Sequence, residues 1–207
     1  GKKFMTAQNK LTDECALVAG SSSGLGLAIA KALADEGCDL HMAGRNPDHL
    51  DDAAEDISDS TSVDVEAHAT DLSSAINAAA LALECDDSGI LINAFGEAPT
   101  GKIVDLEDDD WRQGFELKVF ATISLCREMF ETLGDTGAGI IINIGCPEAT
   151  GICADTINAT LRTFSERLDE EARRDGVRVL FHQPSPDMDD KENANDIVKI
   201  ILGHFAS

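Results

Sequence analysis

The sequence predicts an α/β fold in which a doubly wound parallel sheet of about six strands lies between two layers of helices. Short apolar runs rich in β-branched residues alternate along the chain with longer amphipathic stretches, and such alternation is typical of parallel sheets covered on both faces. A chain of 207 residues can still build one hydrophobic core without dividing. We therefore expect a single three-layer domain over residues 1–207.

The expected elements follow one another in strict order, each strand preceding a helix. Apolar runs of strand length occur at 15–19, 40–43, 63–68, 90–93, 140–144 and 177–181. Apolar residues recur at helical spacing over 24–36, 47–57, 72–84, 108–133, 155–174 and 193–205. No repeat and no interior linker interrupts this order.

The charge of the chain limits its partners. It carries 39 acidic and 16 basic residues, for a formal net charge of −23. Such a surface repels nucleic-acid phosphates and anionic lipids, so we expect neither a nucleic-acid nor a membrane partner. The same acidity is typical of a protein from a high-salt organism or of an ordinary acidic protein, and both interpretations stay open.

The cysteines and the N-terminal residues indicate a reducing compartment. The six cysteines lie singly in apolar segments, which favours buried thiols over disulfides or zinc ligands, so we expect no metal site. No apolar run is long enough to span a bilayer, and residues 1–10 contain no apolar signal core. We therefore expect a cytoplasmic protein.

A glycine-rich turn is the most specific motif of the sequence. Gly20, Gly24 and Gly26 lie between the strand expected at 15–19 and the helix that follows. Glycine permits close backbone approach and positive φ angles, and a helix N-terminus attracts phosphate. Ser22 and Ser23 add hydroxyl donors within the turn. The turn therefore predicts a dinucleotide site in a Rossmann-like fold.

The spacing of these glycines, GxxxGxG, resembles that of the short-chain dehydrogenase/reductase family, and the resemblance runs from Leu17 to about Pro186. Asp71-Leu72 resembles the family's adenine contact, and residues 93–96 stand where the family has Asn-Asn-Ala-Gly. The stretch 115–120 is similar to an uncharacterised bacterial subgroup of that family. The resemblance implies that a nicotinamide dinucleotide contacts Gly20, Ser22, Ser23, Gly24, Leu25, Gly26, Asp71, Leu72, Asn93, Ala94, Gly96 and Pro184.

The end of the second strand predicts which dinucleotide is bound. An acidic residue there would bind the ribose hydroxyls of NAD(H), whereas this chain has Gly44 followed by Arg45. A guanidinium favours the 2′-phosphate, so we expect NADP(H) in preference to NAD(H). The alternative for Arg45 is a solvated residue at the start of a helix.

The family's catalytic residues are replaced in this chain. The resemblance implies a Tyr proton donor supported by Lys, Ser and Asn, yet the sequence contains no tyrosine at all. Alignment places Ala154 at the Tyr position, Asn158 at the Lys position and Cys146 at the Ser position. Lys118 stands at the family's Asn position. The usual mechanism is therefore excluded by composition.

Three groups remain as candidates for chemistry. Lys118 can act as a displaced proton donor or form an ion pair with Glu116 or with a neighbouring helix. Cys146 and Cys153 can be reactive thiolates or packed thiols. His182, at the end of the last strand, is the one well-placed imidazole, with a structural role as the alternative.

The resemblance also implies a shortened substrate side. Residues 184–190 lead almost directly into the last helix, where the family has a helical flap, and the chain reaches Ser207 where the family continues into a seventh strand. Missing cover admits water and weakens hydride transfer. The resemblance further implies a homo-oligomer formed through the helices around 111–133 and 155–174.

Three functions remain open from the sequence. The first is an NADP(H)-dependent oxidoreductase that acts on a small carbonyl or alcohol with an altered proton donor or with residual activity. The second is a catalytically inactive relative that serves as a nucleotide-binding or protein-interaction module. The third is a non-redox enzyme that uses Cys146 or His182.

Overall fold

Six parallel strands form the centre of the computed structural model, which describes residues 10–147 and 151–206. The sheet has the order β3-β2-β1-β4-β5-β6, so the direction of winding reverses beside β1. The strands are β1 Cys15–Ala19, β2 Asp39–Gly44, β3 Val65–Ala69, β4 Ile90–Asn93, β5 Ile140–Ile144 and β6 Arg178–His182. The predicted doubly wound, Rossmann-like fold is thereby confirmed.

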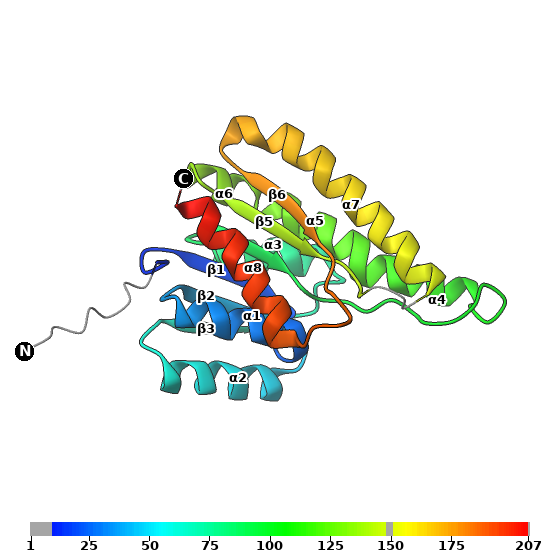
Figure 1. The fold of residues 1–207 in the computed structure, drawn as a ribbon, viewed down its shortest axis with the longest axis horizontal. Coiled ribbons are helices and arrows are strands. Elements are labelled where there is room, and N and C mark those ends of the chain that lie inside the picture. The colour runs from blue at the N-terminus through cyan, green and yellow to red at the C-terminus, as the bar shows by residue number, and fades with distance from the viewer. Residues whose placement is uncertain (1–9, 148–150, 207) are drawn as a thin grey trace, which may run out of the picture.

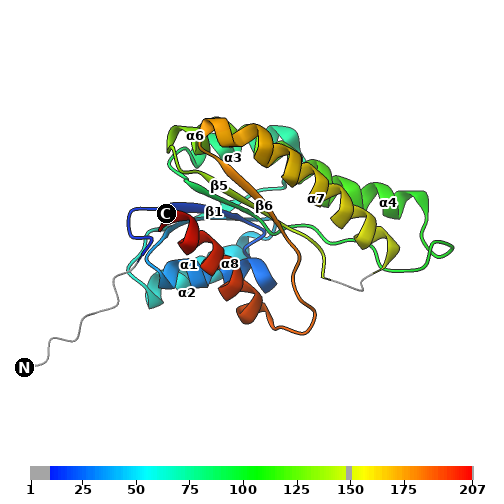
Figure 2. The ribbon, with the colours of Figure 1, turned by 45° about the horizontal axis from the view of Figure 1, so that its top comes forward.

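Helices cover both faces of this sheet (Figures 1 and 2). One face carries α1 Gly24–Asp35, α2 Pro47–Ser60 and α8 Asp190–Phe205. The opposite face carries α3 Ala75–Glu84, α4 Asp108–Gly114, the π-helix η1 Phe115–Phe120, α5 Ala121–Glu128, α6 Phe130–Asp135, α7 Ile152–Ala172 and the 3-10 turn η2 Arg173–Asp175. The alternation of strands and helices in the sequence therefore produces the expected three layers.

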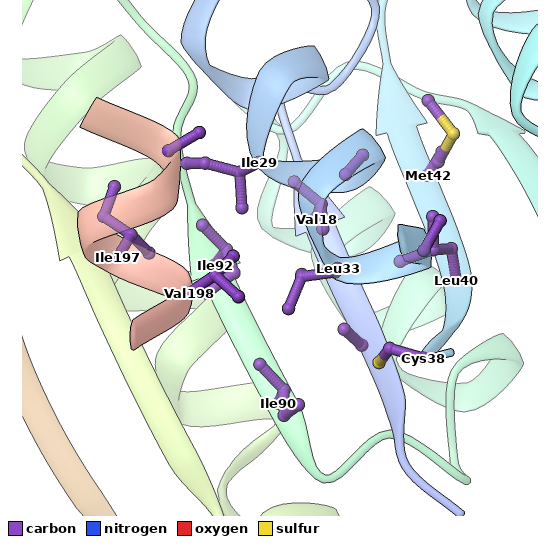
Figure 3. Close-up of a cluster of buried hydrophobic side chains, with 14 of the residues drawn as sticks. Val18, Ile29, Leu33, Cys38, Leu40, Met42, Ile90, Ile92, Ile197 and Val198 are labelled. Carbon is purple, nitrogen blue, oxygen red and sulfur yellow. The ribbon is translucent and has the colours of Figure 1, made fainter. Parts of the chain in front are cut away.

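Alternate residues of each strand supply the two cores. Figure 3 shows Val18, Leu40 and Ile92 of the strands meeting Ile29 and Leu33 of α1. The neighbouring positions along the strands face the other way and pack with α3 and α5. Burying one such side chain stabilises the fold by about 1.5–3 kcal/mol. The near-continuous apolar character of the strands follows from this two-sided burial.

Several expected boundaries are wrong. The helix expected over 108–133 is divided into α4, η1, α5 and α6. The loop after β4 packs closely on η1, because a Cβ at Gly96 would lie only 2.5 Å from the Leu117 carbonyl oxygen. The helical periodicity of the sequence does not reveal a contact of this kind between two elements. Other helices begin at 75 rather than 72, at 152 rather than 155 and at 190 rather than 193. The strand expected at 63–68 begins at 65.

The expectation about a signal core in residues 1–10 lies almost wholly outside the described residues, which begin at Lys10. Over 10–147 and 151–206, no helix combines the length and the apolar character that crossing a membrane requires.

A buried carboxylate joins α7 to the edge strand β6. Asp169 accepts hydrogen bonds from the Val179 backbone N–H at 2.8 Å and from Arg178 Nε at 3.0 Å, and it also binds Arg173. Burial alone would raise the pKa of Asp169, but the Val179 hydrogen bond and the two arginines outweigh burial and lower it. The charged form of Asp169 therefore stabilises the folded chain.

We expect Asp169→Ala to lower the free energy of unfolding by about 1–3 kcal/mol, because it leaves the Val179 N–H and two guanidinium groups without their acceptor. Since folding lowers the pKa of Asp169, its contribution is present above the unfolded value of about 3.9 and disappears as the pH falls through the folded value. Urea unfolding at neutral and acidic pH measures both effects. An unfolding free energy for the variant equal to that of the unmodified chain at neutral pH would contradict this role.

Candidate functional site

A cleft of about 610 Å³ opens at the carboxyl edge of the sheet, between the ends of β1, β2, β3 and β4. Its position is the point where the strand order reverses, which is where open α/β sheets bind their ligands. The cleft has the volume of a cofactor or small-molecule site. The sheet topology therefore fixes where a ligand enters.

The glycine-rich turn between β1 and α1 forms one wall of the cleft. Gly20 has φ +89, and a Cβ there would lie 2.8 Å from backbone atoms of Ala94 and Phe95. A Cβ at Gly26 would lie only 2.0 Å from the Gly20 carbonyl oxygen. The Gly20 backbone N–H also donates to the Ala43 carbonyl at 2.8 Å. Only glycine allows the turn to approach the end of β4 this closely.

The middle of the same turn leaves room for a phosphate. Gly24 has φ +56, and a side chain there would meet only Asp190 Oδ2, at 3.9 Å. Gly24 begins α1, and Ser23 at the N-cap makes no side-chain hydrogen bond to the helix. The positive end of the helix dipole therefore faces the open space. These residues fit the pyrophosphate of a dinucleotide.

The ends of β2 and β3 supply the polar groups of the next wall. Arg45 is exposed and lines the cleft together with Ser22. Ser22 packs against the end of β2, since a Cβ at Gly44 would lie 3.2 Å from the Ser22 Oγ. Hydrogen bonds from Ser73 lower the pKa of Asp71, and the nearby Arg45 lowers it further. A cation and a carboxylate thus lie together where the adenosine half of a dinucleotide would bind.

Eleven of the residues expected to bind the cofactor line this cleft: Gly20, Ser22, Ser23, Gly24, Leu25, Gly26, Arg45, Asp71, Leu72, Ala94 and Gly96. Two expected residues do not. The Asn93 side chain is buried and donates to Asn143 Oδ1 at 2.8 Å, because its position on β4 turns it toward β5 rather than to the cleft. Pro184 is buried and outside the lining.

Sequence reasoning missed other residues of the lining. They are Gly44, Thr70, Ser73, Phe95, Glu97, Ala98, Pro99, Asp110, Gln113 and Leu117. Most of them directly follow the ends of β2, β3 and β4, so strand ends alone could have indicated them. Asp110 and Gln113 come from α4, and no sequence signal placed that helix at the cleft.

Lys118 lies just behind the lining, at the chemical end of the cleft. It is only 4% exposed, and its Nζ donates to the Phe95 carbonyl oxygen at 3.2 Å. Burial lowers the pKa of Lys118, an effect that the neighbouring Cys146 and Glu97 partly oppose. Among the described residues Lys118 forms no ion pair, so the expected alternative of a Glu116 partner is not observed.

Asn158 holds the loop between β5 and α7. Its Oδ1 accepts from the Cys146 backbone N–H at 2.7 Å, and its Nδ2 donates to the Cys146 carbonyl at 2.9 Å. Both ends of the amide are therefore used for structure. Asn158, which stands at the family's Lys position, therefore holds backbone in place here. The two residues Asn158 and Cys146, both expected at the site from the resemblance, lie in direct contact.

The remaining candidates do not point to nucleophilic chemistry. Burial raises the pKa of Cys146 and of Cys153 and so disfavours the thiolate form of both, although the nearby Lys118 partly opposes this effect at Cys146. Ala154 is fully buried in the same small apolar cluster as both cysteines. His182 lies outside the cleft lining, its pKa is lowered by burial, and its Nε2 has no hydrogen-bond partner among the described residues.

Together the fold and the cleft define a nucleotide-binding protein of the doubly wound α/β class. A family model described as short chain dehydrogenase matches residues 14–196. The chain therefore belongs to the short-chain dehydrogenase family.

Two relatives and one structure of the same fold can be compared with this chain. An uncharacterized oxidoreductase of Staphylococcus aureus (strain N315) is 28% identical over 180 residues, which cover 84% of this chain and 78% of the relative. The structure of L-sorbose reductase from Gluconobacter frateurii, complexed with NADPH and L-sorbose, has a TM-score of 0.80 at 28% identity, covering 86% of this chain and 71% of that one. A short-chain dehydrogenase from Sphingobium yanoikuyae in complex with NADPH has a TM-score of 0.84 at 24% identity, covering 92% and 85% of the two chains.

We expect Asn158→Ala to destabilise the fold by about 1–3 kcal/mol, because it leaves a buried N–H and a buried carbonyl of Cys146 unpaired. Chemical unfolding measures the loss. The exposed Asn77, which donates to the Asp71 carbonyl, offers Asn77→Ala as a control with a smaller effect. If both variants were equally stable, Asn158 would not have the structural role assigned to it.

Proposed function

We propose that this protein is an NADP(H)-dependent oxidoreductase that acts on a small carbonyl or alcohol, with Lys118 as the proton donor. The observation that carries the proposal is the buried ammonium of Lys118, which is 4% exposed and has no ion-pair partner among the described residues. An unpaired buried charge destabilises a fold. Lysine in such a place is a candidate for function rather than for stability.

The surroundings of Lys118 suit an acid catalyst. Burial lowers the pKa of its ammonium, and a donor whose pKa approaches the working pH transfers its proton more readily. The Phe95 carbonyl holds Nζ at 3.2 Å without neutralising it. Lys118 therefore holds a proton beside the cleft, where an alkoxide would form on carbonyl reduction.

The cofactor assignment rests on the other end of the cleft. NADP(H), when bound, supplies or accepts the hydride. The turn at Gly24 and the N-terminus of α1 would hold its pyrophosphate, and Arg45 with Ser22 would hold the 2′-phosphate. The G. frateurii relative was solved with NADPH and a sugar substrate, which supports this class of cofactor and of substrate.

The assembly and location that we propose follow the sequence analysis. Residues 1–207 form one domain in a cytoplasmic homo-oligomer. Phe120 of η1 is 53% exposed and Ile152 of α7 is 44% exposed, and large apolar side chains in these positions support pairing of the two helix regions between copies.

A second function is favoured by the locked amide of Asn158. Because both its polar ends bind the Cys146 backbone, and because Ala154 carries no proton donor, the cleft retains none of the family's usual acid–base groups. The alternative is a catalytically inactive relative that binds NADP(H) as a nucleotide-binding or protein-interaction module. It differs from the first proposal in turnover and not in binding.

We expect Arg45→Ala to weaken NADPH binding by about 10- to 100-fold, because it removes a charge-assisted contact to the 2′-phosphate, and to leave NADH binding nearly unchanged. Fluorescence titration with the two nucleotides measures this difference. Arg127→Ala is a matched control, since Arg127 lies on α5 with Glu128 as its ion-pair partner and outside the cleft lining. Equal losses for NADPH and NADH would contradict the assignment of Arg45.

We expect Lys118→Met to reduce the rate of NADPH oxidation on a panel of aldehydes and ketones by about 100- to 10,000-fold while NADPH binding is kept, because it removes the proton donor. Lys118→Arg keeps the charge but cannot release a proton near neutral pH, so it should not restore turnover. Turnover that survives both substitutions would remove Lys118 from the mechanism. NADPH binding by the unmodified protein without turnover on any substrate would favour the inactive relative.

A further inference from the structure

A cluster of histidine, cysteine and carboxylate side chains lies on the α3 face of the sheet, apart from the nucleotide cleft. His41 on β2 and His68 on β3 occupy neighbouring positions of the same face, because His41 pairs with Glu66 and Ala43 pairs with His68 in the strand register. Cys85 caps the C-terminus of α3 above them. The three residues are almost wholly buried, at 6%, 8% and 0% exposure, and none of them lines the cleft.

The two imidazoles form the centre of a hydrogen-bonded chain. His41 Nδ1 lies 2.8 Å from His68 Nε2. The outer nitrogens face carboxylates, with His41 Nε2 at 2.8 Å from Asp87 Oδ1 and His68 Nδ1 at 3.0 Å from Glu84 Oε2. This chain has three contacts, and each needs a proton on one side. Two neutral imidazoles carry only two protons in all.

The contact that lacks a proton lies between the two rings. If each outer nitrogen donates its proton to a carboxylate, two lone pairs face each other at 2.8 Å in the centre. That arrangement is repulsive unless a third proton or a metal cation lies near both lone pairs. The carboxylates of Asp87 and Glu84 favour a cation at this place, since they supply two negative charges to the cluster.

We propose that His41, His68 and Cys85 form a zinc site, with His41 Nδ1, His68 Nε2 and Cys85 Sγ as the ligands. These three atoms lie within 4.8 Å of one another, and Sγ is 3.9 Å from His68 Nε2. Two imidazoles and a thiolate are the ligands that zinc prefers over magnesium or calcium. Glu66, whose Oε2 lies 3.8 Å from His41 Nδ1, or a water molecule would complete the tetrahedron.

The geometry needs only a small adjustment for zinc. With Zn–N bonds of about 2.0 Å at tetrahedral angles, the two nitrogens would be about 3.3 Å apart, which separates the rings by about half an ångström from the 2.8 Å seen here. The surrounding contacts already have the form of a zinc site. Metal-bound histidines donate their second ring N–H to a carboxylate, as Asp87 and Glu84 allow here.

The position of the site suggests a structural task. β3 is an edge strand of the sheet, and a metal bound by His68, His41 and Cys85 would join this edge to its neighbour β2 and to the end of α3. The sequence alone predicts no metal site, because its six cysteines lie singly in apolar segments. The ligands come from separate elements, 27 and 17 residues apart in the chain, and only the fold brings them together.

Cobalt titration of the full chain after treatment with a chelator tests the proposal. We expect one equivalent of Co²⁺ to bind with a thiolate charge-transfer band and intense visible bands typical of tetrahedral coordination, and Zn²⁺ to displace it. Cys85→Ser should abolish the charge-transfer band. His68→Gln should abolish tight binding of Co²⁺. Cys153→Ala and His49→Gln, which alter a thiol and an imidazole outside the cluster, should leave both unchanged.

A variant at the periphery keeps the test decisive if the buried variants fail to fold. The Glu84 side chain is 63% exposed, so Glu84→Ala should fold, and it should weaken zinc binding by about 10- to 100-fold because it removes the acceptor of His68 Nδ1. Absence of a tetrahedral cobalt spectrum would overturn the proposal. Weak binding that is equal in Glu84→Ala and the controls would also overturn it, since the acidic surface alone would explain such binding.

Discussion

The contact between the backbone of the glycine turn and the end of β4 is the constraint on which the rest of the site depends. Gly20 lies against Ala94 and Phe95 with no room for a Cβ, and Gly26 lies against Gly20 in the same way. This contact fixes the start of α1, the path of the chain after β4, and the Phe95 carbonyl that holds Lys118. A change in the turn would therefore reach the chemical end of the cleft through the backbone alone.

One end of the cleft is formed by backbone and the other by side chains, and this difference decides what the sequence could predict. The phosphate end consists of backbone held by glycines, and glycine spacing between a strand and a helix is visible in a sequence. Eleven expected residues accordingly line the cleft. The chemical end consists of side chains whose contacts depend on the fold. Only the structure shows that the Asn158 amide is hydrogen-bonded to the Cys146 backbone. Only the structure shows, likewise, that Lys118 is buried without an ion pair among the described residues.

The fold itself follows the sequence pattern closely, and the departures have physical causes. The expected bounds of β1, β4 and β5 are confirmed, because strands buried on both faces are short, uniformly apolar and clearly bounded. Asn93 was expected at the cleft, but strand alternation turns it toward Asn143. The sequence pattern does not indicate the pair formed by His41 and His68, because its members lie on separate strands. Periodicity describes one element at a time, whereas these features arise between elements.

The π-helix η1 gives the helix that carries Lys118 an unusual tolerance of a one-residue change in length. A wider turn holds one more residue than an α-helix would over the same distance, and such turns occur often at functional sites. Loss of a single residue from 115–120 would return this stretch to α-helical winding, and α4 and α5 would keep nearly their present orientation because the wide turn alone takes up the extra residue. Trp111 and Leu125 would then keep their present neighbours, whereas a residue lost from α4 or α5 would rotate one side by about 100° relative to the other. A one-residue deletion within η1 would therefore change the directions of the side chains in the turn itself, Lys118 among them, and not the packing of the two flanking helices.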